Sequence, residues 1–121
     1  MQCRSLGNVR AGKMPRRGEI WWARLDPTLG SEISKTRPCV VISNSVINEH
    51  RRTVVVIPLS SSPRSAPPLL VDVTCSGKPV VAVIDHVRAI AKERLVSLVE
   101  KLPAAELSAV ERALREILEL D

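Results

Sequence analysis

The chain contains no tyrosine and no phenylalanine, and its only large aromatic residues are two adjacent tryptophans, Trp21 and Trp22. Modules that bind RNA by base stacking present several aromatic platforms. This composition therefore argues against a base-stacking RNA-binding module. Because neighbouring residues of a strand face opposite sides, we expect one tryptophan in the core. The other is expected at an interface or against a base.

Residues that commonly hold metals or cofactors are also scarce. The three cysteines, Cys3, Cys39 and Cys75, are an odd number without paired spacing, which favours reduced thiols in the cytoplasm. Cys39 lies in an apolar run, and we interpret it as a buried core residue. No cysteine or histidine pair has metal-ligand spacing, and there is no glycine-rich loop to hold a phosphate. We therefore expect neither a metal nor a cofactor.

Long apolar runs are missing as well. No stretch of the sequence approaches the roughly 20 apolar residues that a membrane-spanning helix needs. The N-terminus also lacks the central apolar segment of a secretory signal. We therefore expect a cytoplasmic protein without a membrane partner.

The positive charge is concentrated at the start of the chain. Residues 1–17 hold five basic and no acidic residues, which equals the net charge of +5 of all 121 residues. We interpret residues 1–15 as a flexible basic leader, with Met14 as a candidate native start, followed by a single domain over residues 16–121. The overall charge is therefore poor evidence for nucleic-acid binding. Within residues 18–102, however, 11 basic residues against 8 acidic ones allow a modest phosphate-binding surface.

The sequence does contain a series of short β-branched runs, which are typical of strands. Pro38 precedes one of these runs and is expected at the first strand position, where its missing N–H is tolerated. A second proline, Pro58, suggests a bulge or a strand end. Residues 95–102 fit either a strand or a helix. Strands are predicted over residues 19–25, 37–43, 53–59, 69–74 and 80–90, the last of them irregular near Asp85.

One amphipathic helix is predicted to close the chain. Residues 103–120 begin with a proline, which suits a first helical turn, and then place apolar residues on one stripe. Residues 44–52 form a polar connection, residues 60–68 a loop and residues 75–79 a turn. Several short strands with a terminal helix indicate an α+β, mainly β fold, built as a small and strongly bent antiparallel barrel.

The most informative segment runs from Gly18 to Pro38. It reads GEIWWARLDPTLGSEISKTRP, a short apolar strand followed by a polar loop with one carboxylate, Glu32, and one guanidinium, Arg37. This segment resembles the start of the MazF/PemK endoribonuclease toxins, whose pattern is Gly-acidic-Ile-aromatic, Asp-Pro-Thr, Gly-Ser-Glu and Arg-Pro. The resemblance extends over roughly residues 16–120.

The resemblance implies a fold and a function. The fold is an SH3-like antiparallel barrel with a C-terminal helix (MazF/CcdB/Kid-like), in which residues 95–102 form a strand. The function is that of an mRNA interferase, a sequence-specific, metal-independent endoribonuclease that cleaves single-stranded RNA and is the toxin of a type II toxin–antitoxin system. The products would be a 2′,3′-cyclic phosphate and a 5′-hydroxyl. The partners would be a second copy of the chain and a MazE-like antitoxin with an acidic C-terminal tail.

Three residues match the positions of the family that act in catalysis. RNA supplies its own nucleophile, so cleavage needs a base for the 2′-hydroxyl, charge stabilisation at phosphorus and a proton for the 5′-oxygen. Arg37 matches the arginine of Arg-Pro, and its fork of donors suits the phosphate oxygens. Glu32 matches the glutamate of Gly-Ser-Glu and either takes the 2′-hydroxyl proton or orients Arg37. Ser60 matches a hydroxyl that hydrogen-bonds the scissile phosphate.

Other polar residues are candidates for RNA contact or accessory roles. Asp85 matches an aspartate that some members place in the active site, but the basic residue found two positions earlier in those members is Val83 here. A catalytic and a structural role for Asp85 therefore both stay open. The remaining candidates are Ser31, Lys35, Thr36, Arg51, Arg52 and Arg64.

The two histidines are not assigned catalytic roles, although imidazole titrates near neutrality. His86 follows Asp85 in the predicted strand and would therefore point to the opposite face. Family members commonly have glutamine at this position. His50 lies in a polar connection among charged residues.

Two other functions are compatible with a small barrel of this kind. A gyrase-poisoning toxin of the same fold would bind a protein instead of cleaving RNA. Such relatives lack the pairing of Gly-Ser-Glu with Arg-Pro, which favours the nuclease. A non-catalytic nucleic-acid-binding barrel is the third alternative.

Overall fold

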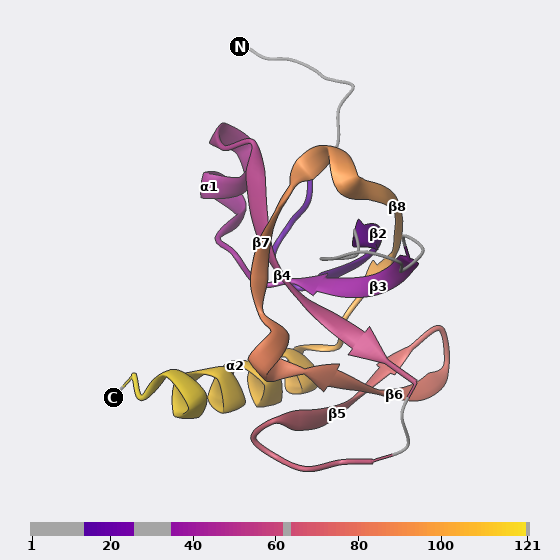
Figure 1. Ribbon diagram of the computed structural model, residues 1–121, viewed down its shortest axis with the longest axis vertical. Coiled ribbons are helices and arrows are strands. Elements are labelled where there is room, and N and C mark those ends of the chain that lie inside the picture. The colour runs from indigo at the N-terminus through magenta and orange to yellow at the C-terminus, as the bar shows by residue number, and fades with distance from the viewer. Residues whose placement is uncertain (1–13, 26–34, 62–63, 121) are drawn as a thin grey trace, which may run out of the picture.

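The computed structural model describes residues 14–25, 35–61 and 64–120 (Figure 1). These residues form strands, two α-helices and two short 3-10 helices. In chain order the elements are β2 (Glu19–Leu25), β3 (Lys35–Val41), α1 (Ser45–His50), β4 (Thr53–Ser60), β5 (Leu70–Cys75), β6 (Lys78–Val83), η2 (Ile84–His86), β7 (Arg88–Ala91), η3 (Lys92–Arg94), β8 (Leu95–Lys101) and α2 (Ala104–Leu118).

The strands form one antiparallel sheet in the order β5-β6-β4-β3-β2-β8, and β7 pairs with β4 beside this path. β4 is the central strand, because it changes partners along its length. Its first residues pair with β7, its middle with β3, and its last two residues, Leu59 and Ser60, with β6. The prediction of a mainly β fold with a C-terminal helix is confirmed. The described strand pairs form an open path and do not close into a barrel.

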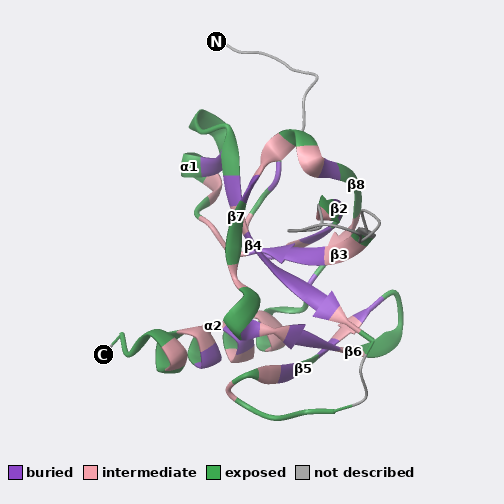
Figure 2. Cartoon of the chain, in the orientation of Figure 1, coloured by how far each residue is buried: buried purple, intermediate pink, exposed green. Residues whose placement is uncertain are grey.

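Two clusters of buried apolar residues stabilise this arrangement. The larger includes residues of β2 to β6 and η2 packed with Val110 and Ala113 of α2. Figures 1 and 2 show α2 beside β5 and η2. The smaller lies among β2, β3, β4 and β7, and contains Trp21 and Cys39. Trp21 is 8% exposed and Trp22 is 40% exposed, so the two tryptophans do face opposite sides of β2 as predicted.

Gly18 of the sequence motif fixes the entry into β2. Its φ of +92° is a conformation that residues with a side chain rarely adopt, and a Cβ atom here would lie 3.2 Å from Leu107 Cδ2 of α2. Its N–H donates to the Val41 carbonyl at 2.7 Å, and its carbonyl accepts from the Leu102 N–H at 2.8 Å. The backbone of Gly18 therefore links the start of β2 by hydrogen bonds to the end of β3 and to the residue that follows β8, and its missing side chain leaves room for Leu107 of α2.

The prediction that Pro38 opens its strand is wrong. β3 begins at Lys35, and Pro38 lies inside it, opposite Trp22 of β2. The pairing of β3 with β4 starts one residue later, at Cys39. Pro38 therefore lies where β3 has a described partner on one side only, and a missing N–H is tolerated at such an edge.

The strand predicted over residues 80–90, irregular near Asp85, is in fact two strands, and the irregular part is a turn of 3-10 helix. β6 ends at Val83, η2 follows, and β7 begins at Arg88. The chain leaves the β4–β6 pair and returns along the other part of β4, and the one turn of 3-10 helix makes this change of direction. Ile84 is fully buried at the start of η2 and anchors the turn in the larger core cluster.

The terminal elements follow the predictions. Residues 95–101 form a strand, β8, paired with β2, and α2 covers most of the predicted helix from 103 to 120. The packed part of the chain already includes Pro15, which is buried and whose carbonyl accepts a hydrogen bond from Asn48 at 3.2 Å. Residues 1–13 of the expected leader lie outside the described residues. None of the helices described is long and apolar enough to cross a membrane.

Candidate active site

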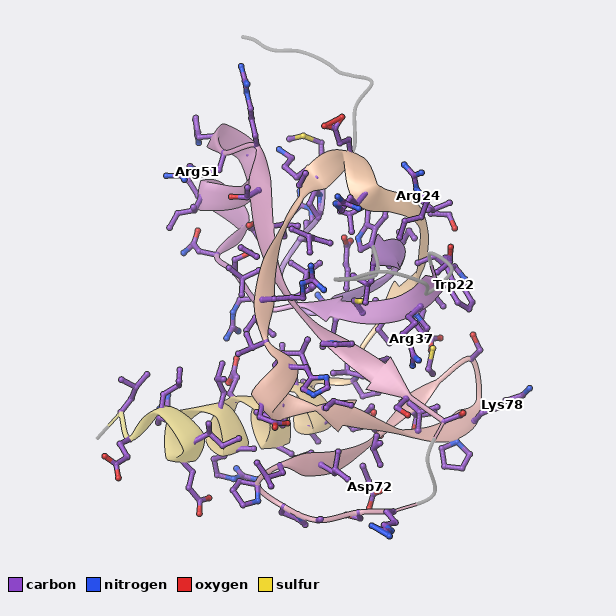
Figure 3. The ribbon with its side chains drawn as sticks, in the orientation of Figure 1. Trp22, Arg24, Arg37, Arg51, Asp72 and Lys78 are labelled. Atoms are coloured by element: carbon purple, nitrogen blue, oxygen red, sulfur yellow. The ribbon has the colours of Figure 1, made fainter. Side chains whose placement is uncertain are left out.

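A pocket of about 520 Å³ opens where β3, β4, η2 and β7 meet. Arg37 comes from β3, Ser60 from the end of β4, His86 from η2 and Arg88 from β7. Figure 3 shows Arg37 near the end of β4, consistent with this placement. The lining residues are Leu25, Arg37, Pro58, Leu59, Ser60, Val83, His86 and Arg88.

Arg37 is held by the strand around it. It is half-buried and lies opposite Ala23 of β2, and the following Pro38 restricts the backbone where the side chain leaves β3. The Arg37 carbonyl is 3.8 Å from Cys39 Sγ, which donates to it. The structure thus places this guanidinium on a rigid strand at the wall of the pocket, where a catalytic group is held more accurately than on a loop.

Arg88 brings a second guanidinium to the same pocket. It is the first residue of β7 and lies opposite Val56 of β4. Burial raises the pKa of the Cys39 thiol to about 12, and the charges of Arg88 and Arg37 partly oppose this rise. Both guanidinium groups therefore lie near the same buried sulfur, and two positively charged side chains at one pocket suit a phosphodiester.

Ser60 lies where the sequence predicted it, at the end of the β4 strand. It pairs with Val81 of β6, is half-buried and lines the pocket together with Arg37. A serine hydroxyl can donate one hydrogen bond and accept others, so it can contact a phosphate oxygen held by the arginines.

His86 also lines the pocket, contrary to the orientation predicted from a continuous strand. The prediction fails because His86 belongs to η2, where the alternation of a strand does not apply. Asp85 of the same turn is exposed and is not among the lining residues. His86, and not Asp85, is therefore the residue of η2 that lines this pocket.

The other predicted site residues do not line this pocket or lie outside the described part of the chain. Glu32 and Ser31 lie outside the described residues. Thr36 is exposed next to Arg37 in β3, and only the backbone of Lys35 is described. Arg64 is exposed in the connection that leads to β5.

Arg51 and Arg52 line a second pocket, of about 390 Å³, at the other end of β4. Lys92 lies there too and donates from Nζ to the Asn48 carbonyl at 2.6 Å. Burial lowers the pKa of Lys92, and Glu49 opposes this effect. The structure therefore does not bring Arg51 and Arg52 to the pocket of Arg37 (Figure 3).

Arg88 was missed by the sequence analysis. A usable signal was present, because Arg88 directly precedes the short apolar run of β7, just as Arg37 stands at the start of the apolar part of β3. Arg37 and Arg88 precede the apolar parts of β3 and β7. If both strands pair with one common strand, these two arginines can belong to one site. Both strands are neighbours of β4.

The pocket as described can bind and polarise a phosphate diester. Two guanidinium groups supply forked donors, the hydroxyl adds one more, and the imidazole can transfer a proton. The described residues contain no group of three His, Cys, Asp or Glu side chains placed to hold a metal ion.

Comparison with known proteins places this chain in a family. A MazF structure from Deinococcus radiodurans matches with a TM-score of 0.76 at 24% identity, over 89% of this chain and 99% of that one. A MazE–MazF structure from the same organism matches with a TM-score of 0.76 at 26% identity, over 90% of this chain and 99% of that one. These likenesses define a toxin of the MazF fold.

The sequence comparisons agree. Endoribonuclease MazF9 of Mycobacterium tuberculosis is 38% identical over 116 residues, which cover 88% of this chain and 98% of the relative. EndoA of Bacillus subtilis, also named an endoribonuclease, is 28% identical over 105 residues, 83% of this chain and 90% of the relative. The model of the PemK-like, MazF-like toxins of type II toxin–antitoxin systems matches residues 16–118. The chain belongs to this family, and the predicted resemblance is confirmed.

Proposed function

We propose that the protein is a sequence-specific endoribonuclease that cuts single-stranded RNA without a metal ion, and the toxin of a toxin–antitoxin pair. The observation that carries the proposal is the shared pocket of Arg37, Arg88 and Ser60. Relatives that match most of the chain are named endoribonucleases. A gyrase-poisoning function would not require two guanidinium groups and a hydroxyl in one pocket. A purely binding protein could hold phosphate with the same groups, and only cleavage of the RNA distinguishes it from the nuclease.

In this proposal Arg37 stabilises the transition state. Attack of the 2′-oxygen on phosphorus concentrates negative charge on the non-bridging oxygens, and a positioned guanidinium offers them two parallel hydrogen bonds. Ser60, across the pocket from β3, adds a hydrogen bond to the same phosphate. The scissile phosphate then lies at the end of β4, where the strand holds its ligands in place.

Glu32 is proposed as the group that receives the 2′-hydroxyl proton. This assignment rests on the Gly-Ser-Glu motif alone. Cleavage by the 2′-oxygen gives a 2′,3′-cyclic phosphate and a 5′-hydroxyl, and needs neither a protein nucleophile nor a metal. Ser31, Lys35, Thr36, Arg64 and Asp85 remain proposed contacts to RNA around this centre.

The proposed partners are single-stranded RNA, a second copy of the chain and an antitoxin with an acidic tail. A relative solved as MazE–MazF supports the antitoxin. An acidic, disordered tail would gain both charge and apolar contacts when it orders across a basic pocket. Since the substrate is cytoplasmic RNA, we propose that the protein acts in the cytoplasm.

Replacement of Arg37 tests the nuclease proposal. Arg37→Ala should slow cleavage of a long labelled transcript in EDTA by about 10²–10³-fold, because one donor to the developing oxyanion is lost. Arg112→Ala is the matched control, since Arg112 is an exposed arginine of α2 that does not line the pocket. Equal cutting rates of wild type and Arg37→Ala would refute the proposal. RNA retention without cutting by the wild type would favour a binding protein.

The proposed dimer has an independent test. Light scattering at micromolar concentration should give twice the mass of the 121-residue chain. A monomer mass would contradict this part of the proposal and leave the nuclease activity unaffected.

A further inference from the structure

His86 lines the pocket of Arg37 but has no role in the RNA-cleavage mechanism proposed above. It is the last residue of η2, and its side chain is exposed to solvent. The other polar groups of the pocket are Arg37, Arg88 and Ser60. A solvent-exposed imidazole at the wall of this pocket can exchange protons with water between turnovers.

The reaction needs a proton donor that these other groups do not supply. The departing 5′-oxygen would leave as an alkoxide, which is a poor leaving group unless it is protonated. Arginine keeps its proton at all physiological pH values, and a serine hydroxyl is a very weak acid. Among the eight described lining residues, His86 is the only one whose side chain commonly serves as a general acid or base.

We infer that His86 is the general acid that protonates the 5′-oxygen as it leaves. The inference rests on the proposed nuclease function and assigns one step of it. The 2′-oxygen forms a bond to phosphorus and passes its proton to the base, proposed above as Glu32. The bond from phosphorus to the 5′-oxygen breaks, and that oxygen takes the proton of the His86 imidazolium. Neutral His86 then regains a proton from water, and the base loses one.

Charged groups lie around His86 on several elements. Arg37 of β3 and Arg88 of β7 line the same pocket, and Asp85 precedes His86 in η2. β4 and α2 also pack against η2. β4 contributes Ser60. On α2, Glu106 accepts hydrogen bonds from Thr74 at 2.8 and 2.9 Å, and Glu111 pairs with Arg17, so these carboxylates are engaged elsewhere.

The other histidine of the chain provides a contrast. His50 belongs to α1, and its Nδ1 lies 2.9 Å from the Val46 carbonyl oxygen of the same helix. It does not line the pocket of Arg37. The two histidines therefore differ in position and not in chemical type, which makes His50 a matched control.

The first experiment compares His86→Gln with His50→Gln on an RNA oligonucleotide that contains one mapped cut site. Glutamine keeps a hydrogen-bonding side chain of similar size but cannot transfer a proton. His86→Gln should lower the single-turnover cleavage rate by about 10²–10⁴-fold, the usual contribution of a general acid. His50→Gln should cut at the wild-type rate.

The second experiment removes the need for the proton. In a substrate whose bridging 5′-oxygen is replaced by sulfur, the leaving group is a thiolate, which departs readily without protonation because a thiol has a pKa near 8.5. His86→Gln should cut this substrate within about tenfold of the wild-type rate. Arg37→Ala should stay slow on it, since the charge on the non-bridging oxygens still develops.

The pH dependence gives a third readout. A general acid must be protonated to act, so the wild-type kcat/KM for the all-oxygen substrate should fall on the alkaline side by about tenfold per pH unit. His86→Gln should lack this falling limb. A histidine that only shapes the pocket would change the rate without removing the limb.

The outcomes separate the two proposals. If the wild type cuts no transcript, the nuclease function fails, and the role of His86 fails with it. If the wild type cuts and His86→Gln cuts the all-oxygen substrate equally well, only the role of His86 is wrong. An equal loss on the oxygen and sulfur substrates would also overturn it, because the defect would then not lie in leaving-group protonation.

Discussion

At the scale of single residues, the pKa of the buried Cys39 thiol responds to the charges of the two arginines that line the pocket. The thiol is fully buried between β2, β3 and β4, yet it lies close enough to Arg37 and Arg88 for both charges to affect its pKa. The desolvation of a thiolate at this depth outweighs the attraction of both guanidinium groups. Cys39 is therefore a neutral core residue, as predicted, and not a nucleophile.

This raised pKa makes stability depend on pH. The folded-state pKa of about 12 lies above the ordinary thiol value of 9.0. The neutral thiol is favoured in the fold, so its contribution is fully present below pH 9 and is lost as the pH rises from 9 toward 12. Between pH 8 and 10 the loss should be about 1 kcal/mol. Urea unfolding of the wild type and of Cys39→Ala at both pH values measures it.

The alanine variant is informative because it has no thiol at this position. Other groups that titrate in the same range, including Cys75, are common to both proteins. The difference in unfolding free energy between wild type and Cys39→Ala should therefore shrink as the pH rises. A difference that stays constant from pH 8 to 10 would contradict the raised pKa.

Arg37 should not be replaceable by lysine. Lysine keeps the positive charge but offers a point charge in place of the planar fork that matches two phosphate oxygens. Arg37→Lys should cut RNA at least about tenfold more slowly than the wild type, and faster than Arg37→Ala, which is expected to lose about 10²–10³-fold. Single-turnover rates at saturating RNA measure this. A lysine variant at full rate would show that charge alone is sufficient.

At the scale of elements, local sequence predicted most of the strands but not the turn that completes the pocket. The runs over residues 19–25 and 53–59 contain enough β-branched and apolar residues to define β2 and β4 by themselves. The stretch over residues 80–90 is equally apolar and was predicted as one strand. It is divided by η2, because the chain there leaves one part of β4 and returns along another, which is a tertiary requirement.

The same limit applies to the site. The position of Ser60 followed from the end of its strand, and Arg37 was named from the family motif. Those of His86 and Arg88 depend on the turn at Ile84, and strand alternation gave His86 the wrong face. Glu32 could be named from its motif but lies outside the described residues. Residues that reach a site because the chain turns from one part of β4 to another cannot be placed from periodicity alone.

Ile84 should therefore be important both for stability and for activity. Its side chain is fully buried at the start of η2, in the cluster that also contains Val110 and Ala113 of α2. Ile84→Ala should lower the free energy of unfolding by roughly 2–4 kcal/mol, the usual cost of such a cavity. It should also slow RNA cleavage, because the turn that holds His86 becomes less well fixed.

Val96→Ala is the control for this effect. Val96 is 50% exposed on β8, so its truncation should cost well below 1 kcal/mol. Urea unfolding of the three proteins gives the comparison. If Ile84→Ala were as stable as Val96→Ala, the turn would not be anchored in the core as described.

At the scale of the whole molecule, β4 joins two basic pockets. Thr53, its first residue, lines the pocket of Arg51 and Arg52, and Ser60, its last, lines the pocket of Arg37. The seven steps from Thr53 to Ser60, at about 3.3 Å each, separate the two ends of the strand by roughly 23 Å. β7 runs beside β4 over part of this path, from Arg88 to Ala91. We therefore predict that RNA bound in the pocket of Arg37 extends along β4 toward the pocket of Arg51 and Arg52.

This arrangement predicts that Arg51 and Arg52 contribute to affinity through phosphate contacts. Each such contact with single-stranded RNA adds about 0.7 to the slope of log affinity against log salt concentration. The double variant Arg51→Ala with Arg52→Ala should reduce the magnitude of this slope by about 1.4. Binding is measured by fluorescence anisotropy with an RNA whose 2′-hydroxyl at the cut site is replaced by hydrogen, so that it cannot be cleaved.

The control must remove the same charge elsewhere. Arg112 and Arg115 lie on α2, are exposed and line neither of the two pockets joined by β4. The double variant Arg112→Ala with Arg115→Ala lowers the net charge equally, so a general field effect would change both slopes alike. A slope that falls only for Arg51→Ala with Arg52→Ala would place the RNA along β4. Equal slopes for both double variants would instead confine the specific contacts to the pocket of Arg37, because distant arginines would then act only through net charge.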